Sequence, residues 1–270
     1  MYAMGVDVGS ASSKAVILDE NRKVIAAAVV QSGTGTSGPA RVMKQIFSDI
    51  GLGRDDISRL VATGYGRMRF EDSDRQLSEI TCHARGVCYL IPEGRTIIDI
   101  GGQDAKAIRL GKSGEVKQFF MNDKCAAGTG RFLEVMARVL ETDLESMAAL
   151  DAGADHPVSI SSTCTVFAES EVISQLSQGS SQKNIIAGVH NSVAAKACGL
   201  AYRCGVEDAV VMTGGVARNA GVVRAIGREL GREILVAPNP QTVGALGAAL
   251  YALDDLIKEG AMVRAGRKNG

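Results

Sequence analysis

The sequence lacks the features that would place this chain in a membrane or on nucleic acid. It contains no run of about 18 apolar residues, the length that a membrane-spanning helix requires. Its 30 lysines and arginines balance its 30 aspartates and glutamates, which gives no reason to expect nucleic acid or an acidic membrane as a partner. The N-terminal residues lack the basic segment and long apolar core of a secretory signal. We therefore expect a cytoplasmic protein.

Proline is scarce and glycine is abundant, with 5 and 32 residues in a chain of 270. This balance indicates tight turns and close backbone approaches rather than a disordered chain. The length is sufficient for two modest domains or one large one. Six cysteines without a secretory signal indicate reduced thiols or metal ligands rather than a disulfide framework.

The chain also lacks a P-loop and an early strand-to-helix G-x-G-x-x-G motif. Instead, two expected strands, over residues 2–8 and 15–18, flank a turn suited to phosphate. The turn supplies a close backbone approach, hydroxyl donors and a cation, from Gly9, Ser10, Ser12, Ser13 and Lys14. Asp7, at the end of the first strand, is placed to hold Mg²⁺ through water. A plain hairpin is the alternative, but this concentration of polar residues favours a phosphate site.

The same pattern recurs 92 residues later, where residues 98–108 align with residues 6–16. The aligned pairs include Asp7 with Asp99, Gly9 with Gly101, Ser10 with Gly102, and Lys14 with Lys106. An internal repeat predicts an α/β fold with two similar domains, each presenting a glycine hairpin to a shared nucleotide cleft. We place the domains at residues 1–93 and 94–270. The last helix, expected over residues 241–258, would pack back toward the cleft.

A third glycine-rich turn follows an expected buried strand over residues 209–213. Gly214, Gly215, Val216 and Ala217 separate this strand from an expected helix over residues 222–230. Glycines in that position let a ligand such as adenosine lie against the backbone. The turn therefore predicts an adenosine site.

Two cysteines each precede an expected helix. Cys125 precedes a helix whose apolar face runs from residue 132 to residue 140, with Thr129 or Asn122 as its cap. Because a helix N-terminus favours negative charge, Cys125 should be unusually acidic. Cys164 lies among residues that can cap a helix, namely Ser161, Ser162, Thr163 and Thr165. It precedes a helical apolar stripe made of Val166 or Phe167, Ile173 and Leu176.

These cysteines are candidate ligands of a soft metal. Their spacing alone favours two buried thiols, because neither belongs to a C-x-x-C pair. Cys82, His83 and Cys88, in an expected helix over residues 76–90, are a further candidate group. Their spacing fits no zinc pattern, which favours a packed helix instead.

The three glycine sites resemble those of the acetate and sugar kinase, heat-shock chaperone and actin superfamily. Its phosphate-one, phosphate-two and adenosine motifs look like residues 5–14, 99–106 and 213–219. This resemblance implies an actin-like fold. By itself it leaves a kinase and a chaperone open.

The sequences around two cysteines narrow the resemblance from the superfamily to one family within it. The sequences around Cys125 and Cys164 are similar to those of the activators of (R)-2-hydroxyacyl-CoA dehydratases and of benzoyl-CoA reductase ATPase subunits. Residues 33–39 and 62–67 also match, and the resemblance covers residues 1–255. Within this family the chain looks closest to the activators for 2-hydroxyisocaproyl-CoA and 2-hydroxyglutaryl-CoA dehydratases.

The resemblance implies a homodimer that holds one 4Fe–4S cluster between its subunits, with Cys125 and Cys164 of each subunit as ligands. Such a protein takes an electron from reduced ferredoxin or flavodoxin and passes it to its dehydratase while hydrolysing ATP to ADP. Asp7 and Asp99 would hold Mg²⁺, and Gln103 or Asp104 would position the attacking water. The alternative is a small-molecule kinase of the same fold with structural thiols. It is disfavoured because the chain has no long specificity insertions.

Overall fold

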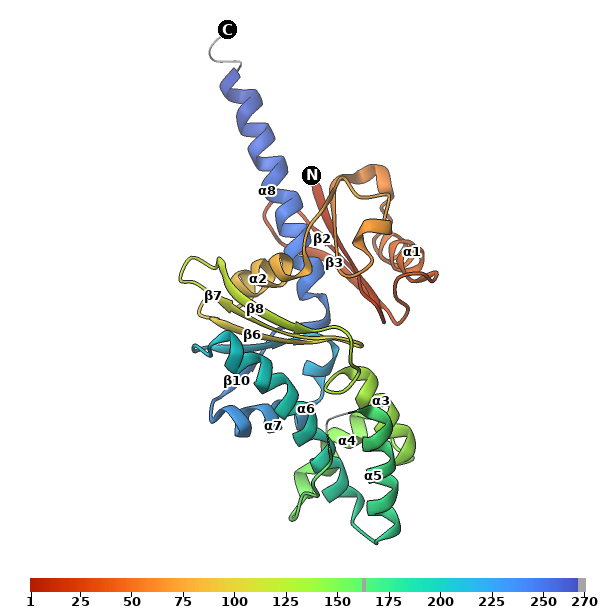
Figure 1. Cartoon of the computed structure of the whole chain (residues 1–270). Coiled ribbons are helices and arrows are strands. Elements are labelled where there is room, and N and C mark those ends of the chain that lie inside the picture. The colour runs from red at the N-terminus through yellow and green to blue at the C-terminus, as the bar shows by residue number, and fades with distance from the viewer. Residues whose placement is uncertain (162–163, 267–270) are drawn as a thin grey trace. The chain divides into compact units, whose positions relative to one another are not determined.

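The computed structural model describes residues 1–161 and 164–266. These form two compact units, shown in Figure 1. Unit 1 contains residues 1–90 together with the chain from Gln241 onward, and unit 2 contains residues 91–240. The sequence predicted domains at residues 1–93 and 94–270, so the C-terminal segment was expected in the second domain. In the structure this segment packs in unit 1.

Unit 1 is built on a five-stranded sheet in the order β3-β2-β1-β4-β5. The strands are β1 (Tyr2–Val8), β2 (Ser13–Leu18), β3 (Val24–Val30), β4 (Ile57–Thr63) and β5 (Arg75–Gln76). β1 pairs antiparallel with β2 and parallel with β4. The helices are α1 (Gly38–Ile50), α2 (Glu79–Leu90) and α8 (Val243–Gly266), with short 3-10 helices at Arg54–Asp56, Arg67–Arg69 and Pro240–Thr242.

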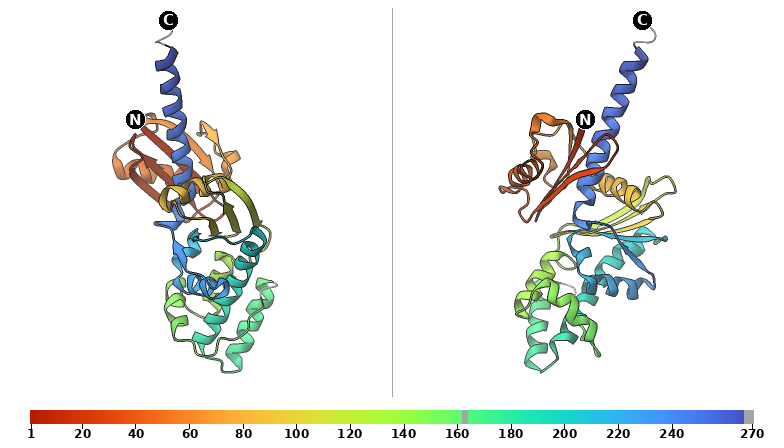
Figure 2. Two further views of the ribbon diagram at one scale, coloured as in Figure 1. Left: turned by 90° about the vertical axis from the view of Figure 1, so that its left-hand side faces the viewer. Right: turned by 180° about the vertical axis from the view of Figure 1, so that it is seen from behind.

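Alternation along the strands divides the core of unit 1 into two layers, because successive side chains of a strand point to opposite faces. Met4, Val6 and Val8 of β1 pack with Val42 and Ile46 of α1. The opposite face packs against α2 and α8, so the sheet lies between α1 and α8 (Figure 2).

Close packing explains why α8 belongs to unit 1. A Cβ atom at Gly5 of β1 would lie 2.0 Å from the carbonyl oxygen of Ala245, and one at Gly247 would lie 1.8 Å from that of Cys82. Glycine is therefore required at both positions for α8 to approach β1 and α2. The helix continues beyond the residue 258 expected from the sequence.

Unit 2 contains a second five-stranded sheet, in the order β10-β9-β6-β7-β8. The strands are β6 (Thr96–Ile100), β7 (Ala105–Leu110), β8 (Val116–Asn122), β9 (Val210–Thr213) and β10 (Ile234–Val236). The helices are α3 (Gly130–Val139), α4 (Leu144–Leu150), α5 (Thr165–Ser177), α6 (Gln182–Cys204) and α7 (Ala220–Leu230), with 3-10 helices η3 (Asp151–Gly153) and η4 (Gly215–Arg218). α6 and α7 pack against each other, and α6 also contacts β7 and β8.

The two sheets share one strand pattern, which confirms the prediction of two similar α/β domains. In each unit a first strand pairs antiparallel with the next strand and parallel with a later one. The registers also correspond, with Asp7 opposite Lys14 and Asp99 opposite Lys106. Among the described residues, no helix is long and apolar enough to span a membrane.

Candidate functional site

The β1–β2 hairpin of unit 1 brings an acid and a base together at its tip. Nζ of Lys14 lies 3.2 Å from Oδ2 of Asp7, and both side chains are largely buried. The backbone N–H of Gly9 donates to the carbonyl oxygen of Ser12 at 3.1 Å, which closes the turn. Ser13 is fully buried and its hydroxyl donates to the carbonyl oxygen of Ser32 at 2.9 Å. Its hydroxyl therefore holds the loop, whereas Gly9 and Ser10 are partly exposed.

Glycine-rich loops pack against this hairpin. The N–H of Thr34 donates to the carbonyl oxygen of Gly9 at 2.9 Å, and the N–H of Gly66 donates to that of Val8 at 2.8 Å. A Cβ atom at Gly64 would lie 2.3 Å from Oδ1 of Asp7, and the φ of Gly64, +90°, is one that glycine adopts readily. The matching sequences at residues 33–39 and 62–67 thus shape the backbone around Asp7.

The β6–β7 hairpin of unit 2 contains the equivalent pair with a second acid. Nζ of Lys106 lies 3.1 Å from Oδ2 of Asp99 and also pairs with Oδ2 of Asp104. Asp99 and Lys106 are both buried. The hydroxyl of Thr213 donates to Oδ1 of Asp99 at 2.9 Å. Gln103, by contrast, is exposed.

The expected adenosine turn lies directly beside this second hairpin. A Cβ atom at Gly214 would lie 2.4 Å from the carbonyl oxygen of Ile100 and 2.8 Å from Oδ1 of Asp99. Gly215 begins η4, and the side chains of Val216 and Ala217 are buried in the core of unit 2. Only the backbone of these two residues is therefore suited to contact a ligand. The structure brings residues 99–106 and 213–217 together within unit 2.

Sequence reasoning missed a third member of the repeat. Thr63 is opposite Asp7 in the sheet of unit 1, as Thr213 is opposite Asp99 in unit 2. Each threonine ends a parallel strand and is followed by a glycine with positive φ, Gly64 or Gly214. The shared Thr-Gly dipeptide is the signal that could have found it. The two Thr-Gly dipeptides are 150 residues apart, whereas the two hairpins are 92 residues apart. An alignment at the hairpin offset therefore does not pair the two dipeptides.

Cys125 lies in the loop between β8 and α3 and is half-buried. Nδ2 of Asn122 donates to its carbonyl oxygen at 3.0 Å. Thr129 is the N-cap residue of α3, but its hydroxyl donates to the carbonyl oxygen of Ala126 at 2.6 Å and does not cap the helix. Both residues expected as caps therefore shape the cysteine loop instead.

The start of α3 is bonded to the β6–β7 hairpin. The N–H of Gly130 donates to the carbonyl oxygen of Gly101 at 2.9 Å, and the N–H of Arg131 donates to that of Gly102 at 2.8 Å. These first amides of α3 are thus engaged by the hairpin and are not directed at Cys125. The same contacts connect the expected phosphate loop directly to the cysteine loop.

Cys164 is the N-cap residue of α5 and is half-buried, but its side chain makes no capping hydrogen bond. The adjoining Ser162 and Thr163 lie outside the described residues. The apolar stripe that follows is exposed to solvent, with Val166 at 66%, Phe167 at 65% and Ile173 at 50% of their full exposure. The smaller Ala168 and Val172 make the buried face of α5 instead.

Three of the four remaining cysteines are buried and differ from these two. Burial raises the pKa of Cys82 and Cys198 to about 12, and burial also raises the pKa of Cys204. Such thiols stay protonated and packed at neutral pH. In the part of the chain that the structure describes, no group of three or more His, Cys, Asp or Glu side chains is placed to hold a metal ion. Cys88 is half-buried but lies within α2 of unit 1, so Cys125 and Cys164, each just before a helix of unit 2, remain as two separate candidate ligands.

Known proteins similar to this chain include ATPases and dehydratase activators. Residues 4–252 match the model of the BadF/BadG/BcrA/BcrD ATPase family. The activator of lactoyl-CoA dehydratase from Anaerotignum propionicum is 68% identical over 96% of this chain and 100% of its own. The (R)-2-hydroxyglutaryl-CoA dehydratase activating ATPase from Acidaminococcus fermentans is 52% identical over 96% of this chain and 99% of its own.

Solved structures give the same result. The activator of the 2-hydroxyisocaproyl-CoA dehydratase from Clostridium difficile, with bound ADPNP, has a TM-score of 0.94 at 54% identity and covers 97% of this chain and 98% of its own. The lactoyl-CoA relative is thus more similar in sequence than the 2-hydroxyisocaproyl-CoA activator, to which the motifs looked closest. A ROK family glucokinase from Streptomyces griseus, with a TM-score of 0.58 at 13% identity over 93% of this chain and 99% of its own, shares the fold alone.

Proposed function

Because this chain belongs to the BadF/BadG/BcrA/BcrD ATPase family, we propose that it is an ATP-hydrolysing activator of an (R)-2-hydroxyacyl-CoA dehydratase. The observation that carries the proposal is the 68% identity to the activator of lactoyl-CoA dehydratase over that protein's full length. Lactoyl-CoA dehydratase is accordingly the first candidate partner. The activity is the transfer of one low-potential electron from reduced ferredoxin or flavodoxin to the dehydratase, coupled to ATP hydrolysis.

The nucleotide groups come from both hairpins in this proposal. Asp7 and Asp99 hold Mg²⁺ through its waters, because Mg²⁺ prefers oxygen ligands and retains much of its hydration. The pairing of each aspartate with a lysine supports this role, since the lysine fixes the carboxylate beside a partly exposed glycine turn. Ser10 and Gly102 offer backbone or hydroxyl donors to phosphate, whereas the N–H groups of Gly9 and Gly101 already donate to the carbonyl oxygens of Ser12 and Asp104 and close their turns. Ser12 and Ser13 are buried and shape the turn.

Gln103 is the better candidate than Asp104 for positioning the attacking water. Asp104 already accepts from Lys106, and its Oδ1 would lie 2.3 Å from a Cβ at Gly101, so it is folded back beneath the turn. Gln103 is exposed at the tip of the same hairpin. An amide side chain near the γ-phosphate orients water in other nucleotide hydrolases.

The donor set of this chain fits half of a 4Fe–4S site. Such clusters are held by four cysteine thiolates, and one chain offers two half-buried thiols, Cys125 and Cys164, in polar turns. Two copies would supply four ligands. When bound, the cluster supplies a one-electron redox centre. The exposed apolar face of α5, which begins beside Cys164, supports a homodimer, because contiguous exposed apolar residues mark interaction surfaces.

The contacts of α3 suggest how nucleotide is coupled to this site. Gly101 and Gly102 accept hydrogen bonds from the first two amides of α3, and Cys125 lies in the loop just before them. A shift of the hairpin on loss of the γ-phosphate would therefore move the start of α3 and the cysteine loop. ATP and ADP can bias this arrangement only through different affinities for its two states.

The proposal is tested by purifying the protein without oxygen and mixing it with lactoyl-CoA dehydratase, ATP and a strong reductant. We expect brown protein with about four irons per dimer, and dehydratase activity that requires ATP. A colourless, iron-free protein that phosphorylates a small molecule would contradict the proposal and support the kinase alternative.

A further inference from the structure

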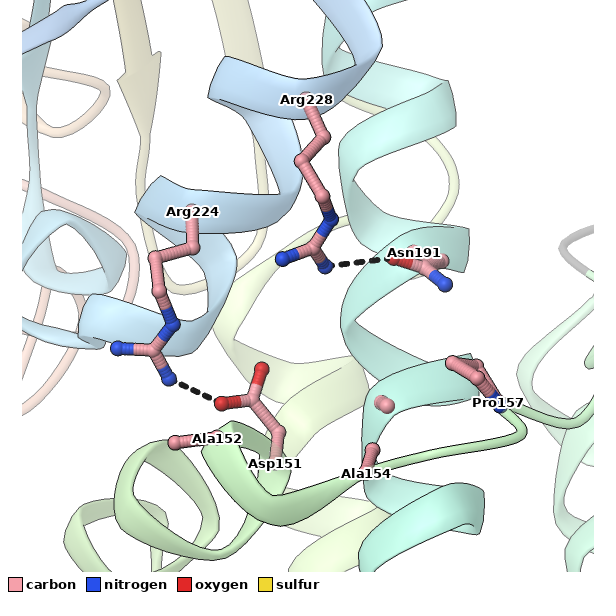
Figure 3. A pocket seen from close by; sticks show the side chains of 8 residues that line it. Asp151, Ala152, Ala154, Pro157, Asn191, Arg224 and Arg228 are labelled. Atoms are coloured by element: carbon pink, nitrogen blue, oxygen red, sulfur yellow. Dashed lines mark hydrogen bonds and ion pairs between the residues drawn. The ribbon is translucent and has the colours of Figure 1, made fainter.

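Unit 2 contains an open surface pocket of about 410 Å³ that none of the loops discussed above lines, and its polar residues Asn191, Arg224 and Arg228 are exposed (Figure 3). Its walls come from η3, α6 and α7 and from the chain that follows η3. Two arginines of α7, Arg224 and Arg228, lie on one side. Asn191 of α6 and Asp151 of η3 face them, and three alanines and a proline complete the lining.

The two arginines lie on one face of α7, because residues four apart in a helix are neighbours. Nη2 of Arg224 pairs with Oδ1 of Asp151 and donates to the carbonyl oxygen of Ala148 at 2.8 Å. Nη2 of Arg228 donates to Oδ1 of Asn191 at 3.2 Å. Among the described residues, no carboxylate pairs with Arg228. The hydrogen bond to the neutral amide of Asn191 leaves this charge uncompensated.

Buried groups hold Asp151 in place. Nδ1 of His190 lies 2.8 Å from Oδ2 of Asp151, and both side chains are almost completely buried. Because a carboxylate only accepts, Nδ1 carries the proton. Nε2 of the same ring then accepts from Nδ2 of Asn219 at 3.3 Å, which makes His190 the neutral tautomer. Asn219 also caps α7 by accepting from the N–H groups of Gly221 and Val222.

The charges of the pocket do not cancel. Burial alone would raise the pKa of Asp151, but hydrogen bonds from His190 and Arg224 outweigh that effect, and the pKa lies below its usual value. Asp151 is thus ionised at neutral pH, and with two guanidiniums it leaves one excess positive charge. That charge is carried by Arg228, an exposed side chain in the last turn of α7.

We propose that this pocket binds a short-chain aliphatic carboxylate. The planar guanidinium of Arg228 suits the two oxygens of a carboxylate. The wall of alanines and proline suits an alkyl group. An inorganic anion would leave this apolar wall without a contact. The site is independent of the nucleotide chemistry proposed above.

Isothermal titration calorimetry of the full chain at constant ionic strength tests the proposal. The probes are butanoate, its neutral isostere butanamide, and inorganic phosphate. We expect butanoate to bind and butanamide not to bind. Arg228→Gln should weaken butanoate binding about tenfold or more, the usual effect of losing a charge-assisted hydrogen bond. Arg232→Gln is the matched control, because Arg232 pairs with Asp208 and does not line the pocket.

A second variant addresses the apolar wall. Ala154→Leu adds bulk to the lining without changing its charge, and it should also weaken butanoate binding. Equal affinity in wild type and Arg228→Gln, or an equal loss in Arg232→Gln, would overturn the site. Binding of phosphate without butanoate would overturn the carboxylate assignment. No nucleotide enters the titration, so a failure of the proposed ATPase function leaves these outcomes unchanged.

Discussion

Replacing Lys106 with methionine should destabilise unit 2 more than Lys14→Met destabilises unit 1. The two lysines are equivalent in the repeat. The side chain of Lys106 is 3% exposed and pairs with both Asp99 and Asp104, whereas that of Lys14 is 14% exposed and pairs with Asp7. The first substitution therefore leaves two carboxylates without their cation, and the second leaves one.

The structure indicates the size of each effect. Removing one partner of a buried ion pair costs about 3–5 kcal/mol, because the other charge stays buried without compensation. Asp99 keeps the hydrogen bond from Thr213, and Asp104, at 21% exposed, is able to turn toward water. We therefore expect the lower end of this range, about 3 kcal/mol, for Lys106→Met. For Lys14→Met we expect about 1.5 kcal/mol, the lower value for losing a hydrogen bond to a charged group.

Urea unfolding of the full-length protein measures the total change, and hydrogen exchange assigns it to a unit. Peptides from β6 and β7 should lose protection in Lys106→Met, and peptides from β1 and β2 should lose it in Lys14→Met. Adding Asp99→Asn to Lys106→Met should recover much of the loss, because it removes a buried negative charge. Equal losses in the two lysine variants, or no recovery in the double variant, would refute this reasoning.

Four further predictions concern the site. Cys125→Ser or Cys164→Ser should abolish iron binding, whereas Cys198→Ser should retain it; an iron and sulfide assay decides. Asp7→Ala should lower the ATPase rate at least tenfold with the iron content unchanged, and a wild-type rate would reject its magnesium role. Because burial raises the pKa of Cys82 to about 12, its thiol should resist iodoacetamide at pH 8 in the folded protein and react after unfolding. Its stabilising effect is complete below the unfolded pKa, about 9, and is lost as the pH rises toward 12. A non-hydrolysable ATP analogue should expose the iron to bipyridyl faster than ADP does, and identical chelation rates would exclude α3 as the coupling element.

Local sequence determined much of this protein. The order Asp7, Gly9, Lys14 predicted a strand-turn-strand hairpin, which the structure shows, although Lys14 was expected to face phosphate and instead pairs with Asp7 across the hairpin. The repetition of this order at residues 99–106 implied a second domain of the same kind. Short-range geometry needs no information about distant parts of the chain, which is why these features could be predicted.

Tertiary packing decided which donors are free. The hydroxyl of Ser13 looked available for phosphate, but it is fully buried and donates to Ser32, 19 positions away. Thr63 joins Asp7 only because β4 pairs with β1. The apolar stripe of α5, from Val166 to Leu176, has the period of a helix, but periodicity does not say what covers it. The structure leaves that stripe exposed and buries Ala168 and Val172 instead.

The same distinction applies to the last helix and the pocket. Gly247 indicated close packing, but only the folded chain shows that its partner is Cys82 of α2, which assigns α8 to unit 1. Arg228 and Asp151 are far apart in sequence and carry no motif. Their shared pocket arises because α7 and η3 pack beside α6. The sequence alone determined the repeated hairpins and the cysteine turns, whereas contacts between distant segments decided which of their groups face a ligand.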